Sequence, residues 1–104
     1  MRDPLKSNVC SKYLKAVAEP DRLRIVQCLR GGPKSVSEIA RQLETPLANA
    51  SHHLKQLREA GLVAASKRGR FVMYALAARF ARAGAGRSLD VLDFGCCRID
   101  LTQK

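Results

Sequence analysis

Residues 35–63 restrict the fold of this chain more than any other stretch. The segment reads SVSEIARQLETPLANASHHLKQLREAGLV, and its apolar spacing predicts a short helix over 36–43 followed by a longer one. Only Glu44 and Thr45 separate the two helices, and so short a connection forces a sharp angle between them. The segment 35–60 is therefore predicted to be a helix-turn-helix.

Both helices carry residues that usually mark helix ends. Ser35 is a suitable cap for the first helix, and Thr45 followed by Pro46 is a suitable start for the second. Gly61 can adopt the left-handed conformation that ends a helix, and Leu62 beyond it can pack back on the last turn. The ends of the second helix are predicted at these positions.

The second helix is predicted to have two different faces. One is apolar apart from one histidine, and it consists of Ala50, His53, Leu54 and Leu57. The other has i, i+3, i+4, i+7 spacing, and it consists of Ala48, Ser51, His52 and Lys55. A helix of this kind can pack on a protein body and present its polar face to the DNA major groove. The alternative interpretation is a generic amphipathic helical hairpin.

Two strands with a basic tip are predicted directly after these helices. Residues 62–66 and 71–76 have the apolar, aromatic and β-branched content of strands. The connection Lys67-Arg68-Gly69-Arg70 supplies a glycine for the turn and three cations. A solvated hairpin tip is the simpler interpretation, but contacts with DNA phosphates explain these cations better beside a candidate recognition helix. Residues 62–76 are therefore predicted to be a β-wing.

The charge of the chain favours a polyanionic partner. Its net charge is +10, from 19 basic and 9 acidic residues. Nucleic acid is the expected partner rather than a membrane, because we find no long apolar run, N-terminal signal sequence or lipidation signal. A cytoplasmic location is expected. We find no nucleophile–base constellation, phosphate loop or paired acids that would indicate an enzyme.

The length of 104 residues predicts a single winged-helix domain over 1–104. Residues 5–18 and 20–30 have helical periodicity. The positions expected to be buried are Cys10, Leu14 and Val17 in the first helix and Leu23, Ile25, Val26 and Leu29 in the second. Residues 77–83 can form a helical turn or two, whereas 84–104 are predicted to be an irregular or extended C-terminal segment. The expected fold class is mainly α with a small β-hairpin, an α+β winged helix-turn-helix.

Three segments resemble the ArsR family of small winged-helix repressors. They are LKAVAEPDRLRIVQCL at 14–29, NASHHLKQLREAGLV at 49–63 and GRFVMYAL at 69–76. The resemblance implies a homodimer that binds an inverted-repeat operator in double-stranded DNA. It also implies release from DNA by an inducer, often a thiophilic metal or metalloid ion.

The resemblance assigns roles to individual residues. Four side chains are expected to reach base edges, namely Leu47, Ala48, Ser51 and His52. Five are expected to meet phosphates or the minor groove, namely Lys55, Gln56, Lys67, Arg68 and Arg70. His53 lies on the inward face, where a buried histidine bonded to a neighbouring backbone group is expected rather than a metal ligand.

Two inducer sites of the family have no counterpart here. Ser35-Val36-Ser37 stands where arsenic and cadmium sensors often carry Cys-Val-Cys. Zinc sensors often carry histidine ligands on a terminal helix, but no histidine follows His53 in this sequence. The inducer is therefore expected to bind elsewhere.

The adjacent cysteines Cys96 and Cys97 are the remaining candidates for an inducer site. Thiolates suit As(III), Cd(II), Pb(II) and Cu(I). Trigonal As(III) needs a third sulfur, and Cys10 is the natural candidate, since the first helix forms part of the dimer interface in the family. A flat strand would point the two adjacent side chains to opposite faces, so chelation requires a turn, which Gly95 allows.

Three alternatives stay open. The two adjacent cysteines can simply be small buried hydrophobes. A redox- or persulfide-sensing repressor would pair Cys28 or Cys10 with Cys96 or Cys97 without a metal, although Cys28 is expected in the core. In a cytoplasmic protein, thiols are expected rather than structural disulfides. A basic interaction module without an operator would bind DNA weakly and without sequence preference.

Overall fold

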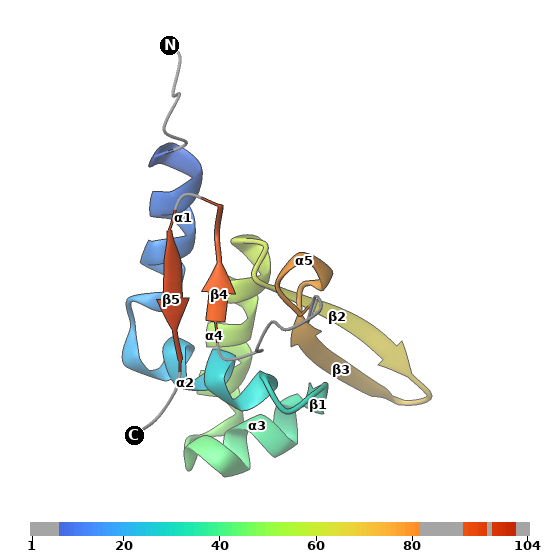
Figure 1. Cartoon of the computed structure of the whole chain (residues 1–104). Helices are drawn as coiled ribbons and strands as arrows, with labels where there is room; N and C mark the ends of the chain where they lie inside the picture. Colours follow the sequence, from blue (N-terminus) through green and yellow to red (C-terminus); the bar gives the residue numbers. More distant parts are fainter. Residues whose placement is uncertain (1–6, 82–90, 96, 102–104) are drawn as a thin grey trace.

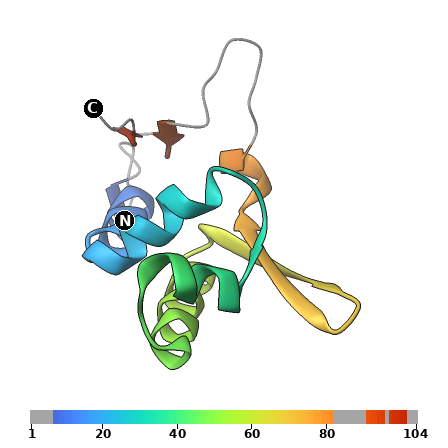
Figure 2. The same ribbon diagram turned by 90° about the horizontal axis from the view of Figure 1, so that it is seen from below.

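The computed structural model describes residues 7–81, 91–95 and 97–101. Its elements are, in order, α1 (Ser7–Val17), α2 (Pro20–Leu29), β1 (Lys34–Ser35), α3 (Val36–Leu43), α4 (Leu47–Glu59), β2 (Val63–Arg68), β3 (Phe71–Leu76), α5 (Ala78–Ala81), β4 (Val91–Asp93) and β5 (Arg98–Asp100). Helices α1 to α4 form the body, and the hairpin of β2 and β3 extends away from it (Figures 1 and 2). The predicted class, mainly α with a small β-hairpin, is confirmed.

Helices α3 and α4 form the predicted helix-turn-helix. At the start of α3, the Ser35 hydroxyl accepts the Glu38 amide at 3.2 Å and the Glu38 carboxylate accepts the Ser35 amide at 3.1 Å. The pKa of the Glu38 carboxyl is held below its usual value, mainly by the hydrogen bond from the Ser35 backbone amide and to a smaller extent by the Ser35 side chain. At the end of α3, Glu44 adopts the left-handed conformation with φ 53°, which turns the chain toward α4.

The start of α4 differs from the prediction by one residue. Pro46, with ψ 147°, is the N-cap, and no side chain caps the first turn. The hydroxyl of the predicted cap, Thr45, instead accepts a 3.5 Å hydrogen bond from the side-chain Nδ2 of Asn49. The prediction for Thr45 is wrong because the extended Pro46 delays the helix until Leu47.

The predicted end of α4 is confirmed. Gly61 has φ 86°, a conformation that a side chain would disfavour. The amide of Leu62 donates to the carbonyl of Leu57 at 3.0 Å, and Leu62 is fully buried. This cap fixes the direction in which the chain leaves α4 to begin the wing.

A three-stranded antiparallel sheet anchors the wing, in the order β1-β3-β2. Strand β1 pairs Lys34 with Tyr74 and Ser35 with Met73. A strand of two residues shows no periodicity, so it could not be predicted. Because β3 is hydrogen-bonded on both sides at its inner end, the wing is attached to the segment that begins α3.

The turn of the wing is shorter than predicted. Strand β2 continues through Lys67 and Arg68, which pair with Val72 and Phe71. Only Gly69 and Arg70 remain as turn residues, and Gly69 has φ 60°. The predicted four-residue tip is therefore wrong in length, because the backbone ladder extends into the charged residues.

The core confirms most predicted buried positions. Those that are buried are Ile25, Val26 and Leu29 in α2, Ile39, Ala40 and Leu43 in α3, and Ala50, Leu54 and Leu57 in α4. Leu23 is only partly buried. In α1 the prediction is wrong at Leu14, which is 41% exposed, because Tyr13 and Ala16 turn inward in its place beside Cys10 and Val17.

The C-terminal segment is extended where it is described, as predicted. Strands β4 and β5 form an antiparallel hairpin that lies beside α1 (Figures 1 and 2). The ring of Phe94 stacks on that of Tyr13 with centroids 5.1 Å apart, and Phe80 of α5 contacts both rings edge-on. These three aromatic residues join α1, α5 and the hairpin. Of the helical turn or two predicted over 77–83, α5 forms residues 78–81, and residues 82–83 lie outside the described part of the chain.

The Ser35 cap provides a test of the helix-turn-helix. Replacement of Ser35 by alanine is expected to lower the free energy of unfolding by about 1 kcal/mol, since an amide of α3 loses its acceptor. Urea denaturation measures this change. Ser37→Ala, at an exposed position inside the same helix, is the matched control and should change stability by less than about 0.5 kcal/mol. Equal losses in both variants would contradict the role of the cap.

Candidate DNA-binding interface and cysteine cluster

The residues predicted to contact DNA all lie on the surface. The exposed side chains are those of Leu47, Ala48, Ser51, His52, Lys55 and Gln56 on α4 and of Lys67, Arg68 and Arg70 on the wing. On the opposite side of α4, Ala50, Leu54 and Leu57 have no solvent-accessible surface. The packing of these three side chains turns the polar face of α4 outward, where a DNA groove can receive it.

The first turn of α4 is suited to a phosphate. Its N-cap, Pro46, provides no side-chain hydrogen bond. The amides at the start of an uncapped helix retain their partial positive charge, and such helix ends bind anions. Leu47, the first residue of the helix, is 51% exposed at this end. The N-terminal end of α4 therefore combines an exposed apolar side chain with a first turn that no side chain caps.

The wing brings a second group of cations to the surface. Lys67 and Arg68 end β2, and Arg70 lies in the turn. Phe71, the partner of Arg68, is 60% exposed. The tip lies well away from the helical body (Figure 2), so its long side chains can reach a surface that α4 itself does not touch.

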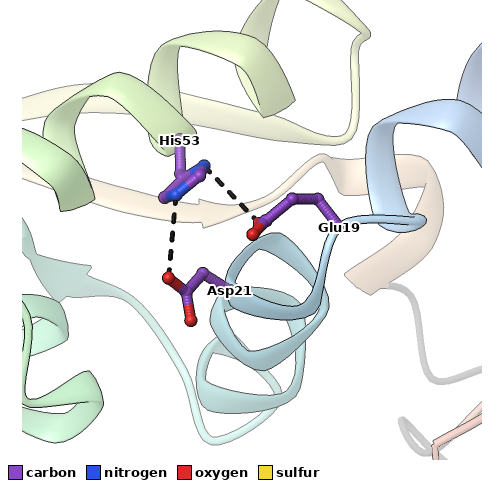
Figure 3. Close-up of side chains that lie close together, drawn as sticks. All are labelled: Glu19, Asp21 and His53. Carbon is purple, nitrogen blue, oxygen red and sulfur yellow. Dashed lines mark ion pairs between the residues drawn. The ribbon is translucent and has the colours of Figure 1, made fainter.

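His53 lies inward, as predicted, but its partners differ from the prediction. Its Nδ1 lies 3.7 Å from Oε2 of Glu19, and its Nε2 lies 3.8 Å from Oδ2 of Asp21 (Figure 3). The Nδ1 atom is buried and has no hydrogen-bond partner. The predicted bond to a backbone group is therefore wrong. Sequence reasoning missed the two carboxylates because no spacing rule links α2 to α4.

The cysteines are in different states. Cys10 is buried on α1 and is disulfide-bonded, which differs from the expectation of free thiols. Cys97 is free and partly buried against the core. Cys96 lies outside the described residues. Among the described residues, the stacking of Phe94 on Tyr13 places the C-terminal hairpin next to α1, the helix that carries Cys10.

The segment around Cys97 turns sharply rather than running as a flat strand. Gly95 has φ 93°, its amide donates to Oδ1 of Asp93 at 2.8 Å, and the amide of Phe94 donates to the carbonyl of Cys97 at 2.9 Å. The turn that Gly95 was expected to allow is thus present.

Cys28 has a local partner of its own. It is a free thiol that packs partly against the core, as predicted, and its Sγ donates to Oε1 of Gln42 on α3. Burial is the main cause that raises the pKa of its thiol above the usual value. A raised pKa disfavours the thiolate, so Cys28 is poorly suited to bind metals or to react with oxidants.

Among the described residues, no helix is long and apolar enough to span a lipid bilayer.

Comparison with known proteins identifies relatives of the chain. Residues 17–64 match a helix-turn-helix domain family. The chain is 37% identical over 76 residues to the HTH-type transcriptional regulator NmtR of Mycobacterium tuberculosis, a match that covers 70% of this chain and 63% of the relative. It is 32% identical over 66 residues to the transcriptional repressor SdpR of Bacillus subtilis, a match that covers 64% of this chain and 73% of the relative. The chain thus spans less than two thirds of the length of the first of these relatives.

Solved structures agree with these matches. A crystal structure of a possible transcriptional regulator for arsenical resistance is 40% identical, with a TM-score of 0.62 over 65% of this chain and 71% of that one. The homodimeric winged helix-turn-helix DNA-binding domain Mb0332 of Mycobacterium bovis, a possible ArsR-family regulator, is 28% identical, with a TM-score of 0.67 over 78% of each chain. On fold, helix-turn-helix sequence and relatives alike, this chain belongs to the ArsR family of winged helix-turn-helix transcriptional regulators.

Proposed function

We propose that this protein is a cytoplasmic, homodimeric repressor that binds an inverted-repeat operator and leaves it when a thiophilic ion such as arsenite binds its cysteines. The observation that carries the DNA-binding part is the outward polar face of α4 beside a basic wing. Ser51 and His52 read base edges in the major groove. Lys55 and the cations of the wing neutralise phosphates and set the register on the duplex.

The surface of α1 supports a dimer. Val9 is 46% exposed and Leu14 is 41% exposed. Both belong to a helix in which Cys10, Tyr13, Ala16 and Val17 are already buried. Because each side chain is already more than half buried, its complete burial against a second copy contributes roughly half of the 1.5–3 kcal/mol of a fully exposed one. A two-fold dimer presents two copies of α4 to successive turns of one duplex, which accounts for an inverted repeat.

Loss of a base contact and loss of a phosphate contact are expected to affect operator binding differently. His52→Ala should reduce discrimination against substituted operators by about 1–3 kcal/mol. Lys67→Ala should weaken binding to all sequences alike and reduce the slope of log K against log salt by about 1. The probe is an operator that the wild-type protein selects from a random DNA pool, and fluorescence anisotropy measures the binding.

Lys12→Ala is the matched control for Lys67→Ala, because Lys12 is an exposed cation on α1, away from the wing. It removes the same charge from the protein. A reduced salt slope in both variants would mean that net charge, rather than contact by the wing, determines the affinity.

For the inducer we propose a site formed by Cys96, Cys97 and Cys10. Once the disulfide at Cys10 is reduced, three thiolates satisfy trigonal As(III), and they also suit Cd(II), Pb(II) and Cu(I). The supporting observations are the tight turn at Gly95 and the packing of the C-terminal hairpin on the helix that carries Cys10. The similarity to a possible regulator of arsenical resistance points to the same class of ion.

Signal transmission follows from the position of α1. This helix packs against both α2 and α4, and it also carries the exposed apolar residues that we assign to the dimer interface. An ion that draws the hairpin toward Cys10 moves α1 and therefore changes the separation of the two copies of α4. A change in that separation weakens binding to a fixed half-site spacing.

The cysteine site is tested by a mobility-shift assay with arsenite. The wild-type protein is expected to release the operator, and the double variant Cys96→Ser/Cys97→Ser is expected to remain bound, because a single remaining sulfur cannot chelate the ion. Cys28→Ser is the control and should respond like the wild type. Release of the double variant by arsenite would exclude this site.

A second candidate inducer is an oxidant, which the disulfide at Cys10 favours. In this alternative, Cys10 would pair with one cysteine of the C-terminal pair, Cys96 or Cys97. Two thiols would lose two electrons and two protons to form the bond, and a peroxide would accept them to form water. The hairpin would then be tied to α1 covalently rather than through an ion.

Mass spectrometry distinguishes these two inducers. After reduction and treatment with diamide, the oxidant mechanism predicts a loss of two mass units, a peptide that links Cys10 to Cys96 or Cys97, and loss of operator binding that dithiothreitol reverses. The ion mechanism predicts a stoichiometric arsenic adduct and no effect of diamide on binding. Unchanged binding by the oxidised protein would reject the oxidant mechanism.

A further inference from the structure

We infer that Glu19, Asp21 and His53 form a binding site for one divalent transition-metal ion, separate from the cysteines. One ligand atom from each of these residues lies within 4.8 Å of the other two. Glu19 is the N-cap of α2, Asp21 is in its first turn, and His53 is on the inner side of α4. This site lies in a different part of the molecule from the proposed inducer site and does not depend on it.

The imidazole lies between two carboxylates. Figure 3 shows the His53 ring with one nitrogen turned toward Glu19 and the other toward Asp21, at 3.7 Å and 3.8 Å. These distances are longer than hydrogen bonds, which rarely exceed about 3.2 Å between nitrogen and oxygen. One ion can bind only one of the two ring nitrogens. The distance from that nitrogen to its carboxylate is close to the separation of about 3.4 Å between two ligands of a tetrahedral ion with bonds near 2.1 Å, and the three ligand atoms lie within 4.8 Å of one another. The side chains are therefore near one another without being joined directly.

The buried Nδ1 atom of His53 lacks a partner that a cation could supply. It has no hydrogen-bond partner, and a buried polar atom left in this state is destabilising. In a neutral imidazole one of the two nitrogens carries a lone pair, and that lone pair here faces a carboxylate oxygen. A cation placed among the three groups converts this repulsion into attraction.

The donor set selects the class of ion. One imidazole and two carboxylates suit Zn²⁺, Co²⁺, Ni²⁺ or Mn²⁺ better than the soft ions that prefer sulfur. The charge of the ion balances the charges of the two carboxylates, and water would complete the coordination.

Neighbouring groups already orient both carboxylates. The amide of Arg22 donates to Oε2 of Glu19 at 2.9 Å, and Nη1 of Arg24 lies 3.2 Å from Oδ1 of Asp21, which leaves Oδ2 turned toward His53. Groups that hold a ligand in this way are typical of metal sites.

The location gives the ion a structural effect on the recognition helix. It would link the start of α2 to the side of α4 opposite the base-reading residues, one position from His52. We therefore expect the ion to raise the melting temperature by several degrees when its concentration is well above its Kd.

Titration with Co²⁺ tests the site, in the 104-residue chain with all four cysteines replaced by serine so that thiolates cannot contribute. Visible absorption is expected to report one Co²⁺ per chain. Asp21→Asn and His53→Gln should each weaken binding by at least about 100-fold, since each removes a direct ligand. His52→Gln is the matched control and should bind Co²⁺ with unchanged affinity, because its ring lies on the exposed side of α4.

The variant Glu19→Gln distinguishes the loss of a metal ligand from a loss of Co²⁺ binding caused by misfolding. Its amide oxygen can still accept the Arg22 amide and cap α2, while the negative charge at the site is removed. It should retain the melting temperature of its parent without Co²⁺ and lose the increase that Co²⁺ produces. The absence of Co²⁺ binding by the parent, or equal loss of binding in the His52→Gln and His53→Gln variants, would overturn the inference.

Discussion

The packing of the inner side of α4 is the constraint on which the rest of the structure depends. Ala50, Leu54 and Leu57 are completely buried, so the helix cannot rotate without exposing apolar surface at about 25 cal/mol per Å². That fixed orientation determines which side chains face outward. It also places His53 on the inside, next to the start of α2. The candidate DNA-reading face and the candidate metal site are thus two sides of one packed helix.

The wing depends on a second, backbone-level constraint. Strand β3 is hydrogen-bonded to β2 along its length and to β1 at its inner end. Because β1 leads directly into α3, the sheet attaches the wing to the helix-turn-helix rather than leaving it as a free hairpin. This arrangement gives the cations at the tip a defined position relative to α4, and a defined position is needed if both are to contact the same duplex.

Helix α1 connects the elements that would sense and respond. Tyr13 stacks on Phe94 of the C-terminal hairpin, and its hydroxyl accepts a 2.9 Å hydrogen bond from Arg79. The same helix exposes Val9 and Leu14. A change at the hairpin therefore reaches the surface that we assign to dimerisation through a single rigid element. The metal site inferred at His53 acts on α4 by a different route, through α2.

The sequence by itself determined the elements whose signals are local. Helix α3 has its predicted bounds, the Gly61 cap ends α4 where expected, and the predicted core positions of α2 to α4 are buried apart from the partly buried Leu23, because periodicity and capping are properties of neighbouring residues. Only the tertiary structure decided that Tyr13 rather than Leu14 faces the core, that two residues at 34–35 form a strand, and that two carboxylates of α2 meet His53. Each of these depends on contacts between segments far apart in the chain, and such contacts leave no periodic pattern in the sequence of either segment.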